Sequence, residues 1–142
     1  MYRHILIPTD GSQPAERGLA QGLALAKSLG AKVSVIFVVE PFSELTGRFL
    51  EAVATYAELR KEQAVSVLDR AANAAKKAGL SCETIQAENG QPHEAIIAAA
   101  KDKGCDLIVM SSHGRSGLSA LLIGSVTNKV LTHAKVPVLV CQ

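Results

Sequence analysis

The sequence contains no tryptophan, and aromatic residues make up only 4% of its 142 residues. Apolar residues still account for 48%, so the hydrophobic core must be aliphatic, which suits helices packed on a buried sheet. The 15 basic and 13 acidic residues leave a net charge of +2, and this balance argues against a general nucleic-acid or membrane binder. The length fits one domain, so residues 1–142 are expected to form a single domain.

Cysteine is scarce, and no segment resembles a targeting or membrane signal. Cys82, Cys105 and Cys141 form no C-x-x-C pair and have no zinc-like spacing to histidine, so we expect buried, reduced thiols. The first residues, MYRHILIPTD, lack the apolar stretch of a signal peptide. No uncharged apolar run reaches the roughly 18 residues of a membrane span. We therefore expect a cytoplasmic protein without a membrane segment.

Short apolar runs and longer helical patterns alternate along the chain. The runs predict β-strands at residues 4–9, 32–39, 80–87, 106–111 and 136–141. The helical patterns cover residues 12–29, 48–78 with an irregular start, 92–103 and about 124–134. This order predicts an α/β fold, an open five-stranded, mostly parallel sheet with helices on both faces and strand order 3-2-1-4-5.

Two strands should differ from the others. The third run alternates apolar and polar residues, so it should be less buried. Pro137 in the last run cannot donate a ladder hydrogen bond, so that strand should lie at an edge of the sheet, or Pro137 should lie at its very start. An exposed edge can pair with a second chain, so dimerisation through residues 136–141 is expected.

Two segments should meet where a ligand would bind. Open parallel sheets bind ligands beyond the carboxyl ends of their strands, where the strand order reverses. The first strand ends in PTDGS, residues 8–12, in which Gly11 permits a tight turn and Asp10 projects from the sheet. The fourth strand runs into SSHGRSGLSALLIGS, residues 111–125. If these strands are neighbours, the two segments face each other across the crevice.

The segment 111–125 has the chemistry of an anion site. Gly114 and Gly117 let the backbone approach a ligand closely and adopt positive φ. Gly124 and Ser125 stand at a helix start, where free N–H groups and the helix dipole favour an anion. Asp10 would hold a ribose hydroxyl or a magnesium ion on the phosphates. The segment's further polar groups are those of Ser111, Ser112, Ser116 and Arg115. These features predict a nucleotide site, although a Gly/Ser loop is also an ordinary connection between a strand and a helix.

Other nucleotide-site motifs are missing from the sequence. It contains no G-x-x-x-x-G-K-[ST], and no G-x-G-x-x-G follows the first strand. A receiver domain would need an acidic cluster after the first strand and an aspartate after the third, where only Glu88 stands. The S-G-G-x-D-S and H-I-G-H motifs of nucleotidyl transferases are also absent. His113 lies in the loop, but no clear general base accompanies the anion site, so we expect at most weak ATP hydrolysis.

The whole chain, from ILIPTDGS to PVLVC, resembles a single-domain universal stress protein. The nucleotide-binding branch of that family carries G-x-x-G-x(9)-G-[ST], a frame that falls here on Ser111, Gly114, Gly124 and Ser125. The segment NGQPHEAI is similar to the one that lines the adenine side. The resemblance implies an adenine-nucleotide α-hydrolase-like fold and a dimeric stress regulator or sensor that binds ATP or AMP, with magnesium as a further ligand.

The resemblance also implies a set of binding residues. These are Pro8, Thr9, Asp10, Val38, Val39, Gly90, Ser111, His113, Gly114, Arg115, Ser116, Gly117, Gly124, Ser125 and Val126. Ser111 replaces the first glycine of the motif, so its side chain either crowds the ribose and phosphates, forces a different backbone angle or bonds to a phosphate. The alternative is a dimeric stress adaptor that binds no nucleotide, in which Ser111 marks a lost site.

Overall fold

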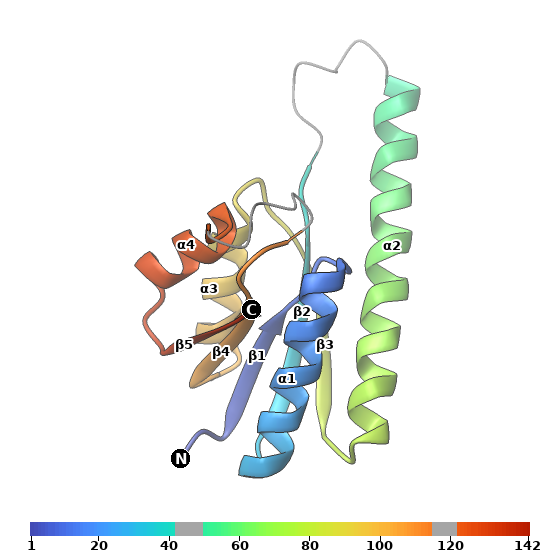
Figure 1. Cartoon of the computed structure of the whole chain (residues 1–142). Helices are drawn as coiled ribbons and strands as arrows, with labels where there is room; N and C mark the ends of the chain where they lie inside the picture. Colours follow the sequence, from blue (N-terminus) through green and yellow to red (C-terminus); the bar gives the residue numbers. More distant parts are fainter. Residues whose placement is uncertain (42–49, 115–121) are drawn as a thin grey trace.

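The computed structural model describes residues 1–41, 50–114 and 122–142. The strands are β1 (His4–Pro8), β2 (Lys32–Val39), β3 (Cys82–Glu88), β4 (Leu107–Ser111) and β5 (Val138–Cys141). The helices are α1 (Gln13–Leu29), α2 (Leu50–Lys77), α3 (Pro92–Asp102) and α4 (Ser125–His133) (Figure 1). The irregular start expected for the second helix, between Pro41 and Gly47, lies outside the described residues. Elsewhere the predicted elements are confirmed, with ends that move by one or two residues.

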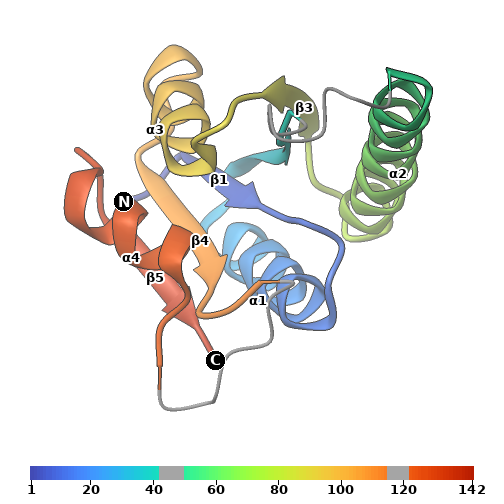
Figure 2. The same ribbon diagram turned by 90° about the horizontal axis from the view of Figure 1, so that it is seen from above.

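The strands form one parallel sheet of order β3-β2-β1-β4-β5, which confirms the predicted topology. Helices α1 and α2 cover one face of the sheet, and α3 and α4 cover the other (Figure 2). The central strand β1 pairs with β2 on one side and with β4 on the other. The strand order therefore reverses at β1, where such sheets bind their ligands.

The core is aliphatic on both faces of the sheet. Because successive side chains of a strand point to opposite faces, Ile5 and Ile7 of β1 pack toward α1 and α2, and Leu6 packs toward α3 and α4. All three side chains are fully buried. The edge strand β3 is only partly buried, as its alternating sequence predicts.

Helix α1 begins with a side-chain cap only a few residues after the end of β1. Ser12 is its N-cap, and the Ser12 Oγ accepts a hydrogen bond from the Ala15 N–H at 3.3 Å. Pro14 lies in the first turn and Glu16 adds a negative charge there, both of which favour a helix start. The turn that carries Asp10 therefore lies between a buried strand and a capped helix.

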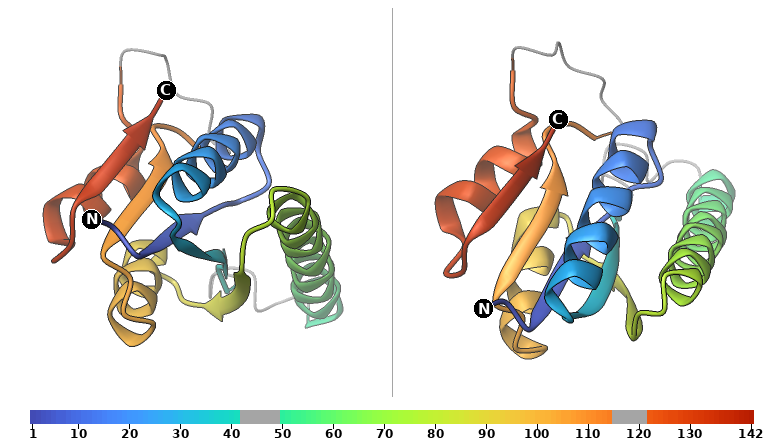
Figure 3. Two further views of the ribbon diagram at one scale, coloured as in Figure 1. Left: turned by 90° about the horizontal axis from the view of Figure 1, so that it is seen from below. Right: turned by 60° about the horizontal axis from the view of Figure 1, so that its bottom comes forward.

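The strand β5 forms the other edge of the sheet, outside β4 (Figure 3). Pro137 immediately precedes the strand, and its carbonyl accepts a hydrogen bond from the Ile108 N–H at 3.0 Å. The edge position predicted for this strand is confirmed, and the proline lies just before its first residue. Cys105 and Cys141 are buried and Cys82 is half-buried, all as free thiols. Across the described ranges, no helix combines the length and the hydropathy that crossing a membrane requires.

Candidate functional site

A cavity of about 320 Å³ lies at the carboxyl ends of β1, β2 and β4. This volume is within the usual range for small-molecule sites. Strand ends supply Pro8, Thr9, Asp10, Ile36, Val38, Glu40, Met110, Ser111, His113 and Gly114; helices supply Ala15, Arg60, Pro92, Ile96, Ser125, Val126 and Thr127, with Gly124 at the start of α4. The cavity is therefore at the predicted point of strand reversal.

Most of the predicted binding residues that the structure describes line this cavity. They are Pro8, Thr9, Asp10, Val38, Ser111, His113, Gly114, Gly124, Ser125 and Val126. Two do not: the side chain of Val39 is buried in the core beneath α1 and α2, and Gly90 lies exposed between β3 and α3. Val38 and Val39 differ because adjacent side chains of β2 point to opposite faces of the sheet. Arg115, Ser116 and Gly117 lie outside the described residues.

The sequence analysis missed several residues of the cavity wall. They are Ala15, Ile36, Glu40, Arg60, Met110 and Thr127. Pro92 and Ile96 also line the cavity, and both belong to the predicted segment NGQPHEAI. The period of two in a strand was an available signal for Ile36 and Glu40, which alternate with Val38. Arg60 had no such signal, because its place depends on where α2 packs against the sheet.

The turn after β1 holds the Asp10 carboxylate in place. The Ser12 N–H donates to Asp10 Oδ1 at 3.0 Å, and the Gly11 N–H donates to Thr9 Oγ1 at 3.2 Å. Gly11 has φ +79°, a left-handed conformation that other residues adopt only at a cost, so the tight turn is confirmed. The bond from Ser12 comes from the backbone, so the turn itself contributes to the position of the carboxylate.

Gly114 brings the segment after β4 against Asp10. A Cβ atom on Gly114 would lie 2.6 Å from Asp10 Oδ2, so any side chain here would force the Asp10 carboxylate to shift. The close approach seen here is to Asp10, and the predicted close approach to a ligand stays a prediction. The expected positive φ is wrong, because Gly114 is not among the described glycines with positive φ. The missing side chain, and not an unusual backbone angle, is what this position requires.

Ser111 fits its position without backbone strain, since its φ is not positive. It is the last residue of β4 and is buried, with 8% of its surface exposed. Its Oγ donates to the His113 carbonyl at 2.6 Å, and its own carbonyl accepts a hydrogen bond from Thr127 Oγ1 at 2.9 Å. The hydroxyl that replaces the motif glycine is therefore bonded within the protein, and the backbone carbonyl of Ser111 links β4 to the start of α4.

Helix α4 begins at the cavity, and the residue before its first turn has an extended backbone conformation. Gly124 is the N-cap, with φ −61° and ψ 155°, and no side chain caps the helix. Its N–H donates to the Ser112 carbonyl at 2.7 Å, and a Cβ atom on it would lie 3.2 Å from that oxygen. The N–H groups of the first turn have no intrahelical acceptor, and the positive end of the helix dipole adds to their attraction for an anion.

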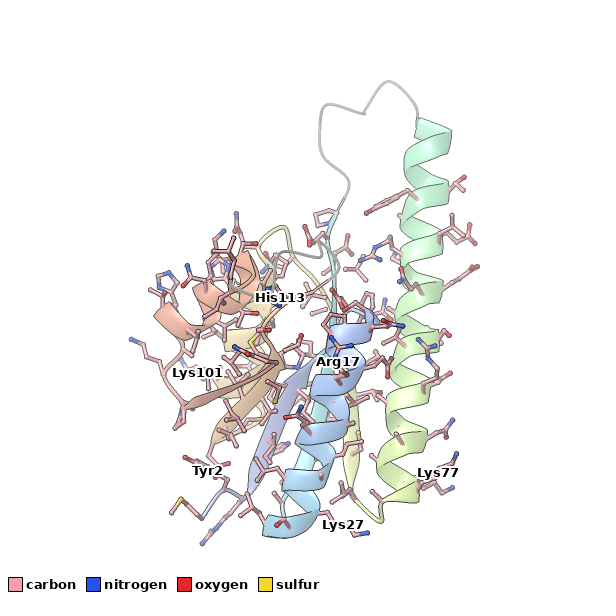
Figure 4. The ribbon with its side chains drawn as sticks, in the orientation of Figure 1. Tyr2, Arg17, Lys27, Lys77, Lys101 and His113 are labelled. Atoms are coloured by element: carbon pink, nitrogen blue, oxygen red, sulfur yellow. The ribbon has the colours of Figure 1, made fainter. Side chains whose placement is uncertain are left out.

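His113 lies beyond the carboxyl end of β4 (Figure 4). Its Nδ1 is 2.9 Å from Ser112 Oγ. Within the part of the chain that the structure describes, no group of three or more His, Cys, Asp and Glu side chains is arranged to hold a metal ion. In nucleotide sites magnesium is often held by one or two carboxylates together with phosphate oxygens and water.

Comparison with known proteins agrees with this architecture. A model of the universal stress protein family matches residues 1–142. The universal stress protein YxiE of Bacillus subtilis is 35% identical over 149 residues, which covers 100% of both chains. The solved structure of MJ0577, a universal stress protein of Methanocaldococcus jannaschii, has a TM-score of 0.84 at 31% identity and covers 99% of this chain and 95% of that one.

A third similarity concerns a structure with a ligand. The universal stress protein from Archaeoglobus fulgidus, solved in complex with dAMP, has a TM-score of 0.74 at 24% identity and covers 99% of this chain and 98% of that chain. At this identity the likeness shows the fold alone. From the family match over residues 1–142 and the identity to YxiE, the chain belongs to the universal stress protein family.

Proposed function

We propose that this chain binds an adenine nucleotide, ATP or AMP, in the cavity and acts in the stress response as a dimeric regulator or sensor with little or no hydrolysis. The observation that carries the proposal is that one cavity joins the uncapped start of α4 to an apolar wall. A nucleotide needs both, because its phosphates are anionic and its aromatic base has flat, largely apolar faces. The dAMP complex of the Archaeoglobus fulgidus protein supports an adenine nucleotide.

The order of the strands suggests how the nucleotide lies. The phosphates would bind the N–H groups of Ser125 and Val126 in the first turn of α4, beside Gly124, whose own N–H is bonded to the Ser112 carbonyl. The base would lie against Ile36 and Val38 of β2, and neighbouring strands are about 4.8 Å apart. Since β1 separates β4 from β2, Asp10 at its end would face the ribose between the phosphates and the base.

Slow or absent turnover follows from the groups that line the cavity. Hydrolysis needs a positioned water, a base and neutralisation of the leaving phosphates. The described titratable side chains of the wall are those of Asp10, Glu40, Arg60 and His113. Asp10 accepts a hydrogen bond in its turn, and His113 Nδ1 is 2.9 Å from Ser112 Oγ. We therefore propose that occupancy of the site, and not turnover, carries the signal.

The proposed dimer would form through β5. This strand is an edge of the sheet, and Leu139 on it is 45% exposed. An edge strand presents unpaired backbone groups that a second copy can match. The adaptor without a ligand remains the second candidate, and it would use the same edge.

A charge placed at the start of α4 tests the nucleotide site. Ser125 is exposed in the first turn, so Ser125→Glu adds a carboxylate where a helix tolerates it well. Two unit charges about 5 Å apart repel by about 2 kcal/mol at an effective dielectric constant of about 30. Calorimetric titration with AMP, and with ATP and magnesium, should show binding by the wild type and at least tenfold weaker binding by the variant.

A matched control is available on the same helix. Thr132→Glu adds the same charge at an exposed position about 10 Å further along α4. This variant should bind AMP as the wild type does. If the wild type binds no adenine nucleotide, or if both variants lose the same affinity, the proposed site is wrong and the adaptor is favoured.

A further inference from the structure

Arg60 of α2 lines the cavity without belonging to the segments that predicted the site. Its guanidinium carbon lies 5.4 Å from the centre of the Phe37 ring, and its Nη1 donates a hydrogen bond to Gln63 Oε1. Phe37 is fully buried on β2, and a guanidinium over an aromatic face is attracted to it. The side chain is thus held against the sheet at the cavity wall.

The same side chain carries an unused hydrogen-bond donor. The Nε atom of Arg60 is buried and finds no hydrogen-bond partner among the described residues. Buried N–H groups are almost always paired in folded proteins. The ion pairs found within the described ranges join Arg70 to Glu16 and Lys103 to Glu83, so neither neutralises Arg60. Because Arg60 lines the cavity, a hydrogen-bond acceptor on a ligand can pair with a donor of its guanidinium.

The position of Arg60 indicates which part of a bound nucleotide it would contact. Its partner Phe37 belongs to β2, whereas α4 follows β4, and β1 lies between these strands. An anion at the start of α4 is therefore separated from Arg60 by two strand spacings, roughly 10 Å. The part of a nucleotide that extends toward β2 is the nucleoside. Its acceptors are the purine ring nitrogens and the ribose oxygens.

We infer that Arg60 is a specificity contact for the nucleoside, to which its guanidinium donates a hydrogen bond, and that it does not bind the phosphates. The inference rests on the proposed nucleotide site and adds to it a residue from the opposite side of the cavity. The Phe37 ring and Gln63 orient the guanidinium before the ligand arrives. Arg60 thereby favours a ligand with an acceptor at this place over one that presents only apolar atoms.

The test compares AMP with adenosine on matched variants. Arg60→Met keeps an unbranched apolar stem over Phe37 but removes every donor. Arg70→Met is the control, because Arg70 is exposed on the same helix and does not line the cavity. Calorimetric titration in 0.15 M salt limits the direct attraction between Arg60 and a distant phosphate, since the screening length is then about 8 Å.

We expect Arg60→Met to weaken AMP and adenosine by a similar factor, about tenfold, which corresponds to one hydrogen bond from a charged donor. Arg70→Met should match the wild type, and thermal unfolding of all three proteins checks that each is folded. Unchanged affinity in Arg60→Met overturns the inference, and so does a loss confined to AMP, which would place Arg60 at the phosphates. If the wild type binds neither AMP nor adenosine, the proposed function is wrong as well. If the wild type binds both and Arg60→Met binds them with the same affinity, only this inference is wrong.

Discussion

Replacing Gly11, the glycine of the turn that carries Asp10, should lower the stability of the protein more than replacing a glycine in open space. Its φ is +79°, and a Cβ atom there would lie 2.7 Å from Cγ2 of Val67, which is buried on α2. Gly79 has a similar φ of +75°, but a Cβ atom on it would meet nothing within 4 Å. The two glycines share the conformational requirement and differ in the space around them. The pair Gly11→Ala and Gly79→Ala therefore separates the two effects.

The expected magnitudes follow from these two terms. A left-handed alanine costs about 1 kcal/mol of unfolding free energy relative to glycine. Forcing a methyl group against a packed side chain costs about 2 kcal/mol more. Gly79→Ala should therefore lose about 1 kcal/mol, and Gly11→Ala about 3 kcal/mol. For a chain of this size each kcal/mol shifts Tm by roughly 3 °C, so the shifts should be about 3 °C and about 9 °C.

Urea unfolding followed by circular dichroism measures both losses, and titration with AMP measures the effect on the site. The Gly11 N–H and the Ser12 N–H hold Thr9 and Asp10 in the turn, so Gly11→Ala should also weaken AMP binding while Gly79→Ala leaves it unchanged. If Gly11→Ala costs no more stability than Gly79→Ala, the close contact with Val67 does not constrain the turn and the reasoning fails.

Three further predictions concern groups away from the cavity. The pKa of His4 lies below its ordinary value of 6.5, chiefly because the side chain is buried and also because the positive charge of Lys32 is near. Just below pH 6.5, His4 is therefore protonated in the unfolded chain but still mostly neutral in the folded chain. The unfolding free energy should then fall as the pH drops through 6.5 toward the lowered pKa. Urea titrations at several pH values should show a smaller fall for His4→Gln than for the wild type, and an equal dependence on pH in the two proteins would contradict this. The half-buried Cys82 should react with iodoacetamide before Cys105, whose pKa burial raises to about 11, and mass spectrometry that finds Cys105 labelled first in the native protein would refute it. Leu139→Lys, at the exposed edge of β5, should shift a dimer to a monomer in analytical ultracentrifugation, and a wild type that is monomeric at micromolar concentration would exclude the edge-strand dimer.

Several features of the fold were predictable because they depend on neighbouring residues. The apolar run 32–39 predicts a strand, and β2 occupies those residues. The last run, 136–141, was predicted two residues too long, because the strand begins only after Pro137. The two turns of the cavity were predictable for the same reason. Asp10 follows a strand and precedes a helix cap, and Gly124 precedes a helix, so a few adjacent residues set each conformation.

Other features of the cavity could not be predicted from local patterns. The period of two shows that Val38 and Val39 point to opposite faces, but only the packed helices decide which face borders the cavity. The need for glycine at position 114 was predicted, but its cause is the Asp10 carboxylate, which lies far away in the sequence. Arg60 was missed for the same reason.

The sequence by itself determined the elements, their alternation and hence the parallel sheet, because strand and helix periods and turn residues act over short stretches of chain. It also predicted where the cavity lies, since the strand order places the segments after β1 and β4 together. Only the tertiary structure decided which side chains meet at that place. The placement of Arg60 against Phe37 and the fit of Gly114 against Asp10 depend on helix and loop positions that no local pattern encodes. Their physical cause is close packing between segments that are distant in the sequence.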